Sequence, residues 1–209
     1  MAYPTVEAPY GLVPYNLIGG QPYAGSTRQM TIASGYAANI FTGDIVKRAA
    51  DGTIQKETGT ATVTATGVIG VFVGVTYTDP GTSQKTFKQY WPTGTVASDA
   101  KAYVVDDPDA LFKVAVVSSG STISGTGYTS IGSNAALVQN SGSTTTGNSA
   151  VAINGINTTL SLPMRIVDVV EETADTSGNY TEVIVKWNAP YENSNVATGG
   201  HAYMTATGL

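Results

Sequence analysis

The sequence contains no cysteine and only one histidine among its 209 residues. The absence of cysteine excludes disulfides, thiolate nucleophiles and cysteine metal ligands. A Ser-His-Asp site needs a base beside its nucleophile. The single candidate, His201, follows two glycines in a polar segment, which is typical of a surface residue. We therefore expect no enzyme activity and no cofactor.

Charged residues are also scarce, at 12% of the chain, which is about half the usual share. Ten Lys and Arg stand against fifteen Asp and Glu, so the net charge is −5. Nucleic-acid binding requires clustered cations that displace counterions. Lys47-Arg48 is the only adjacent basic pair, so we expect no nucleic-acid partner.

The sequence shows neither a membrane segment nor an export signal. The longest apolar run, 68–75, is interrupted by glycine and is far shorter than the ~20 residues of a membrane helix. Met1-Ala2-Tyr3-Pro4 lacks a basic region followed by an apolar one. We expect a protein that is made without export and has no membrane partner.

Residues 1–28 form a distinct segment in which proline and tyrosine recur at short intervals. Proline fixes φ and removes a backbone donor, so a helix or a central strand is disfavoured here. The segment is nevertheless too apolar for a solvated tail. We expect an extended arm that lies either on its own domain or on a neighbouring subunit.

From residue 29 to 190 the signals are those of strands, and we expect one all-β domain of the small β-barrel or jelly-roll-like type. Met30-Thr31-Ile32-Ala33 alternates, and Asp51-Gly52 is a preferred type I′ hairpin turn. Residues 164–170 and 180–187 predict a long hairpin. No helix longer than about two turns is expected.

Two regions are less regular. Residues 118–155 are rich in serine, glycine and threonine, and we expect a loop region that keeps short strands, since so long a pure loop would be unusual. One of these is expected at 134–139, as a strand or a helical turn. Residues 191–209 are polar and glycine-rich, and we expect a loosely held tail.

Carboxylates offer one check for chemistry. Asp106, Asp107 and Asp109 surround Pro108 and could form a glycosidase pair or a calcium site. Their spacing lacks the regular calcium-loop pattern that a Glu closes, so an acidic turn between two strands is favoured. Glu171-Glu172 is interpreted as a polar strand end. No metal site is expected.

Aromatic side chains on a β domain raise the possibility of sugar stacking, with Tyr90, Trp91 and Trp187 as the candidates. Tyr90 and Trp91 would point to opposite faces of a strand, so only one could join a platform. Trp187 ends an alternating strand and is expected to cap the barrel end. Use in the core or in an interface is favoured for these residues.

Three stretches carry a family resemblance: Gly43-Asp44-Ile45-Val46-Lys47, Asp51-Gly52-Thr53-Ile54 and Val68-Ile69-Gly70-Val71-Phe72-Val73-Gly74. They resemble the head decoration, or cement, proteins of tailed bacteriophages. The opening segment, Tyr90-Trp91-Pro92 and Asn179–Val183 are similar to virion proteins of short-tailed phages of aquatic bacteria. The resemblance implies a β-barrel whose structural motif is Gly43, Asp44, Asp51, Gly52, Gly70 and Gly74.

The resemblance also implies a function. A decoration protein trimerises on the outer surface of the expanded capsid and clamps neighbouring capsomers. The expected partners are the phage major capsid protein and further copies of the chain, which is made in the bacterial host cytoplasm. The alternative is a glycan- or receptor-binding β module of a tail fibre or spike.

On the decoration hypothesis the arm contacts the capsid. Its deletion over residues 2–28 is expected to weaken attachment and to leave the β domain folded. The candidate contact residues are Tyr3, Pro4, Pro9, Tyr10, Leu12, Pro14, Tyr15, Leu17, Ile18, Tyr23 and Arg28.

Overall fold

The computed structural model describes residues 9–62, 68–174, 180–188 and 201. These residues form strands β1 to β16 and two single-turn 3₁₀ helices, η1 (Tyr128–Ser130) and η2 (Glu171–Thr173). The expected all-β fold is confirmed. The described part of the chain contains no helix that is long and apolar enough to span a membrane.

Strand β6 is the longest strand of the first large sheet and lies in its middle. Its members are β2 (Arg28–Thr31), β4 (Ile45–Arg48), β5 (Ile54–Lys56), β6 (Gly70–Thr78), β7 (Lys85–Lys88) and β9 (Lys101–Val105). The strand order is β2-β9-β6-β4-β5, and β7 pairs with the far end of β6. All its strand pairs are antiparallel.

The second large sheet is built mainly from the later part of the chain. Its members are β1 (Val13–Leu17), β10 (Ala110–Ala115), β13 (Asn134–Val138), β14 (Ala152–Asn157), β15 (Met164–Val169) and β16 (Glu182–Trp187). The order is β1-β10-β16-β15-β13-β14. The predicted hairpin is confirmed, because β15 pairs with β16 and Ile166 lies opposite Val185.

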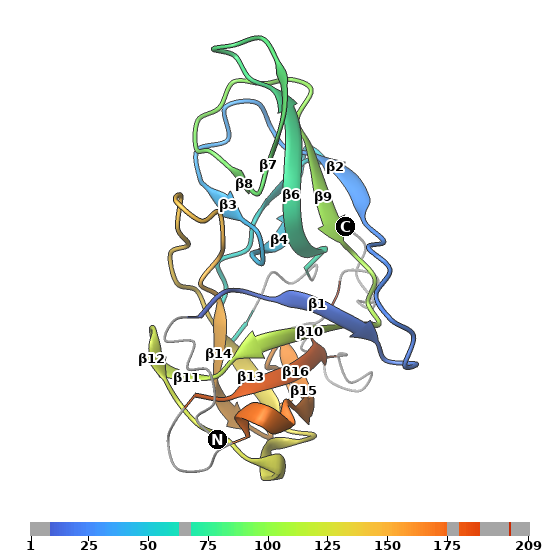
Figure 1. The fold of residues 1–209 in the computed structure, drawn as a ribbon, viewed down its shortest axis with the longest axis vertical. Coiled ribbons are helices and arrows are strands. Elements are labelled where there is room, and N and C mark those ends of the chain that lie inside the picture. The colour runs from blue at the N-terminus through green and yellow to red at the C-terminus, as the bar shows by residue number, and fades with distance from the viewer. Residues whose placement is uncertain (1–8, 63–67, 175–179, 189–200, 202–209) are drawn as a thin grey trace.

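Two short strand pairs complete the structure: β3 (Ile40–Phe41) with β8 (Tyr90–Trp91), and β11 (Val117–Ser119) with β12 (Thr122–Ile123). Figure 1 shows the first sheet at one end of the long axis and most of the second sheet at the other. Strand β1 crosses the middle of the molecule beside β10.

The described residues form no closed barrel, so this part of the sequence-based expectation differs from the structure. The same edge of β6 pairs with β4 near its start and with β7 near its end. The two ends of the strand order, β2 and β5, meet among the described residues in one parallel bridge, between Ile32 just after β2 and Ile54 of β5. One bridge is no strand pair, so the sheet is not closed into a cylinder.

Two hydrophobic clusters stabilise the two sheets. The first-sheet cluster centres on Phe72, Tyr77 and Trp91, all nearly inaccessible to solvent. The second-sheet cluster includes Phe112 and Trp187 and extends across the junction to residues of β4, β6 and β9. Trp91 and Trp187 both lie in these cores, as the core interpretation of the tryptophans predicts.

The glycines of β6 allow a close approach of neighbouring groups. A Cβ at Gly70 would lie 2.1 Å from the carbonyl oxygen of Val105 on β9. A Cβ at Gly74 would lie 2.7 Å from the ring of Phe87 on β7. The register of β6 against β9 shifts between Phe72 and Gly74, which marks a bulge at this point.

The Asp51-Gly52 turn joins β4 to β5 as predicted, but it is not a type I′ turn. Gly52 has a φ of +84°, whereas Asp51 has no positive φ. The amide of Gly52 donates to the carbonyl of Ala49, and Ala49 donates to Thr53. The longer loop places only glycine in the left-handed region, so Asp51 escapes that strain.

The region expected to be rich in loops contains more order than its composition indicates. It holds β11, β12, η1, β13 and the first part of β14. In the expected 134–139 segment, residues 134–138 form the strand β13. Residues 60–62 are in no strand, and 63–67 lie outside the described residues. Most of the expected tail lies outside them too.

Candidate functional site

The most extensive buried polar cluster begins in the loop between β3 and β4. The amide of Asp44 donates to the carbonyl of Phe41 at 2.9 Å, and the amide of Phe41 donates to Asp44 Oδ2 at 2.9 Å. Gly43, with a φ of +92°, permits this tight reciprocal turn. The Asp44 side chain is thereby directed into the interior, where it is fully buried.

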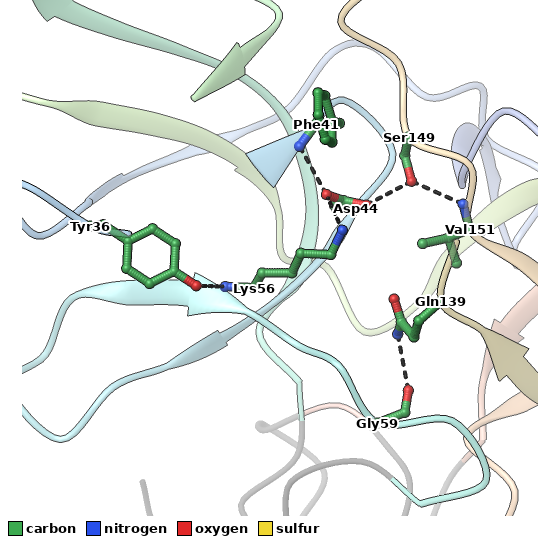
Figure 2. A network of polar contacts seen from close by, with 8 residues as sticks. All are labelled: Tyr36, Phe41, Asp44, Lys56, Gly59, Gln139, Ser149 and Val151. Atoms are coloured by element: carbon green, nitrogen blue, oxygen red, sulfur yellow. Dashed lines mark hydrogen bonds and ion pairs between the residues drawn. The ribbon is translucent and has the colours of Figure 1, made fainter. Parts of the chain in front are cut away.

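Two further side chains neutralise and orient this carboxylate (Figure 2). Lys56 Nζ of β5 forms an ion pair with Asp44 Oδ2 at 2.8 Å, and Ser149 Oγ donates to Oδ1 at 2.7 Å. Ser149 Oγ in turn accepts from the amide of Val151 at 3.0 Å. The carboxylate accepts from three donors, which is the pattern of a structural anchor and not of a poised acid or base.

The cluster lies where three distant segments meet. The amide of Leu12 donates to Gly43 at 3.0 Å, and the amide of Ser149 donates to Thr42 at 2.8 Å. The backbones are so close that a Cβ at Gly11 would lie 2.7 Å from Cβ of Ser149. Sequence reasoning recognised Gly43 and Asp44 as structural but did not identify Lys56 or Ser149 as their partners.

A surface hollow of about 560 Å³ adjoins this junction. Its lining includes Asn39, Phe41, Lys56 and the 141–144 segment. Lys56 is already paired with Asp44, so the remaining polar groups are one amide and several hydroxyls. No group of three metal-ligating side chains occurs among the described residues.

The described part of the arm lies on its own domain, which answers the question that the sequence left open. Leu12 is 1% exposed in the second-sheet core, and β1 pairs with β10 as an edge strand. Pro14 is tolerated in β1 because an edge strand needs no second partner. Tyr3 and Pro4 lie outside the described residues.

The arm residues divide into anchors and exposed groups. Pro9 is buried, and Tyr10, Pro14, Leu17 and Tyr23 are partly buried. Arg28 is exposed in β2 and forms an ion pair with Asp106 at 2.9 Å.

The exposed apolar side chains of the arm form one group on and just after β1. Val13 is 41% exposed, Tyr15 48% and Ile18 52%. Val13 and Tyr15 are two residues apart on β1, whose register against β10 shifts between Pro14 and Leu17. Sequence reasoning selected Tyr15 and Ile18 but missed Val13, although its spacing from Tyr15 in an extended segment was a usable signal.

Tyr10 attaches the start of the arm to the second sheet. Its hydroxyl donates to Glu182 Oε1 at 2.6 Å, and the Tyr180 hydroxyl donates to the same oxygen at 3.0 Å. Lys113 Nζ pairs with Glu182 Oε2 at 3.2 Å. Burial, followed by the contacts with Glu182, raises the pKa of both Tyr10 and Tyr180 well above the usual 10.0.

His201 lies in the interior, so the expectation of a surface residue is wrong. It is fully buried and forms a bridge with Val68. Its ring lies 6.2 Å from that of Trp187, and burial lowers its pKa. The two glycines before His201 are typical of an exposed loop, so no feature of the sequence indicated this packing.

The other candidates for chemistry are two acidic groups and one aromatic residue. Asp109 forms an ion pair with Lys186 at 2.6 Å, and Asp107 Oδ1 accepts from the amide of Asp109. The acidic turn between β9 and β10 is thus present as expected. Glu171 and Glu172 are exposed on η2. Tyr90 is partly buried and stacks on Phe41 at a centroid distance of 5.5 Å.

Comparison with known proteins adds no identification. No protein-family model, no curated protein and no solved structure matches this chain.

Proposed function

We propose that this chain is a structural virion protein that binds the outer surface of an expanded phage capsid and clamps neighbouring capsomers as a trimer. The proposal combines the resemblance of the Gly43–Gly74 region to head decoration proteins with an all-β fold. The capsid protein and further copies of the chain are the proposed partners.

The observation that carries the proposal is the exposed apolar group Val13, Tyr15 and Ile18. The edge strand held by β10 presents Val13 and Tyr15, and Ile18 follows it with its amide bonded to Asp109. Pre-organised apolar groups bind with a small entropic cost, and tyrosine supplies contact area with few rotatable bonds. Such a surface suits attachment to another protein better than it suits catalysis.

Physical considerations agree with a clamp. A ligand that binds only the expanded lattice stabilises that state by mass action. A cyclic trimer repeats each contact three times, so modest contacts add through avidity. A net charge of −5 disfavours contact with the packaged genome and suits the outer surface.

The glycan-binding alternative receives less support. Both tryptophans are buried, at 0% for Trp91 and 2% for Trp187, so neither presents a face for a sugar. Tyr90 is occupied by its contact with Phe41.

The test uses expanded heads of the phage that encodes the chain. The triple variant Val13→Ser, Tyr15→Ser, Ile18→Ser removes the apolar group without touching the core. We expect its occupancy on these heads to fall at least about tenfold, the loss that ~1.4 kcal/mol produces. Leu160→Ser is the matched control, because Leu160 is 64% exposed and lies outside the arm. Equal occupancy of the triple variant and the control would reject the arm as the attachment site.

A further inference from the structure

One face of the first sheet carries an aromatic pair, in which Phe87 is exposed and Tyr103 is partly buried. Phe87 of β7 is 60% exposed, and its ring lies 6.0 Å from that of Tyr103 on β9. The two strands flank β6, where Gly74 lies opposite Tyr103 and leaves room for the Phe87 ring. An exposed aromatic side chain packed beside a second aromatic ring resembles the aromatic anchors found at interface centres.

The same face carries two lysines and no carboxylate on its strands, although the whole protein is acidic. Arg28 of β2 and Lys88 of β7 do not belong to it, since Arg28 pairs with Asp106 and Lys88 lies over the ring of Tyr77. Lys85 is two residues from Phe87 on β7, and Lys101 is two residues from Tyr103 on β9, so both lysines lie on the face of the aromatic pair. Both are exposed. Asp99 lies at the border of this face, accepts a hydrogen bond from Thr78 and lies near Lys85. Among the contacts found, Lys101 has no carboxylate partner.

The opposite end of the molecule has the complementary character. Asp168, Glu171 and Glu172 are exposed at the end of β15 and on η2, and no ion pair found among the described residues involves them. Arg165 is the exposed cation of β15, so the acidic side chains outnumber it. Figure 1 places β7 and β15 at opposite ends of the long axis.

Exposed apolar groups accompany these acids. Tyr128 is 53% exposed and Ile131 42% exposed. The segment that follows them is hydrogen-bonded to β15, because Gly132 donates to Ile166 and Ile166 donates to Ser133. This end therefore offers both apolar area and negative charge, as a partner for an aromatic and basic face would.

We propose that the Phe87–Tyr103 face of one copy docks on the β15–η2 end of a second copy, with Lys101 beside the acids of η2. The contact joins two different surfaces, so it is heterologous and can close into a ring. The inference rests on the proposed trimer and names the surfaces that form it. It uses none of the exposed side chains of β1, which remain available for the capsid.

The test is the mass of the purified full chain by light scattering at micromolar concentration, with charge reversal and rescue. We expect Lys101→Glu and Glu172→Lys each to weaken association about tenfold per contact, because each replaces an attraction by a repulsion. The double variant Lys101→Glu, Glu172→Lys should restore the wild-type mass. High salt should weaken the wild-type assembly.

A reciprocal pair of variants separates this inference from the capsid proposal. Phe87→Ser should reduce the mass to that of one chain, whereas Ile18→Ser should leave it unchanged and reduce only capsid occupancy. A monomeric wild type, or a double variant without restored mass, would overturn the inference while leaving capsid binding to its own test. Loss of capsid binding by Phe87→Ser with an unchanged mass would instead assign the face to a different partner and also overturn it.

Discussion

At the scale of single residues, Asp44 shows how a motif with no chemistry of its own can organise a fold. All three partners of its side chain are donors, and they come from β3, β5 and the segment before β14. The sequence indicated a structural role for Gly43-Asp44. It could not identify Ser149, because the contact spans 105 residues and Ser149 belongs to no recognisable pattern.

Asp44→Asn should therefore destabilise the protein strongly. The amide group of asparagine would direct its own donors at Lys56, Phe41 or Ser149 in a buried site. We expect a loss of ~3 kcal/mol in the free energy of unfolding, measured by urea denaturation. Asp51→Asn is the control, since Asp51 is exposed and bonds only within its own turn. A loss as small as that of the control would contradict the anchor role.

Gly70 gives a second residue-scale prediction. Gly70→Ala would place a methyl group 2.1 Å from a backbone oxygen that cannot move without separating β6 from β9. We expect a cost of about 3 kcal/mol, at the upper end for overpacking. Gly19→Ala is the matched control, because nothing lies within 4 Å of its added Cβ. The measurement is the thermal unfolding midpoint of each variant. Equal midpoints would refute the close approach of Gly70 to β9.

The Tyr10–Glu182–Tyr180 group predicts a loss of stability in alkali. Both tyrosines have a pKa raised in the folded state, so their contribution is complete below the ordinary value of 10.0 and is lost as pH rises above it. Each contributes a slope of about 1.4 kcal/mol per pH unit in that window. Tyr10→Phe should make the urea midpoint fall less steeply above pH 10. An unchanged slope would show that Tyr10 ionises freely.

At the scale of elements, strand β1 combines the proposed attachment residues with contacts that stabilise the fold in one segment. Proline and tyrosine in the sequence correctly indicated extended structure. They could not show that Leu12 enters the core, because the pairing with β10 is set by residues about 100 positions later and by loop closures that no local pattern records.

The structure accordingly changes the expected effect of deleting residues 2–28. Deletion removes the edge strand, the buried Leu12 and the Tyr10 contacts, so we expect a clear fall in the thermal midpoint instead of an intact domain. The triple serine variant should keep a midpoint close to that of the wild type, because its three side chains are exposed. Loss of folding in the serine variant would contradict the division into anchors and exposed groups.

Strands with strong alternation were predictable, and paired strands in polar sequence were not. The 164–170 and 180–187 segments alternate clearly and form β15 and β16. Strand β14 lies in a glycine-rich stretch, where pairing with β13 rather than side-chain propensity decides the conformation. The expected closed barrel is not formed. Which strands pair along each edge of β6, including β4 and β7 on the same edge, depends on tertiary register, and the alternation of residues cannot predict it.

At the scale of the whole molecule, different surfaces are proposed to have different tasks. The Asp44 junction connects the two sheets, the exposed side chains of β1 are proposed to contact the capsid, and the Phe87–Tyr103 face is proposed to contact another copy. Because only 12% of the residues are charged, few charged side chains with bound water surround these apolar groups.

The most direct test of capsid decoration is the binding stoichiometry on purified heads of the encoding phage. The protein is mixed with expanded and with unexpanded heads, and bound copies per capsid subunit are counted after sedimentation. We predict saturable binding in a fixed ratio on expanded heads and little on unexpanded ones. No saturable binding to expanded heads, with the protein folded and in excess, would contradict the account.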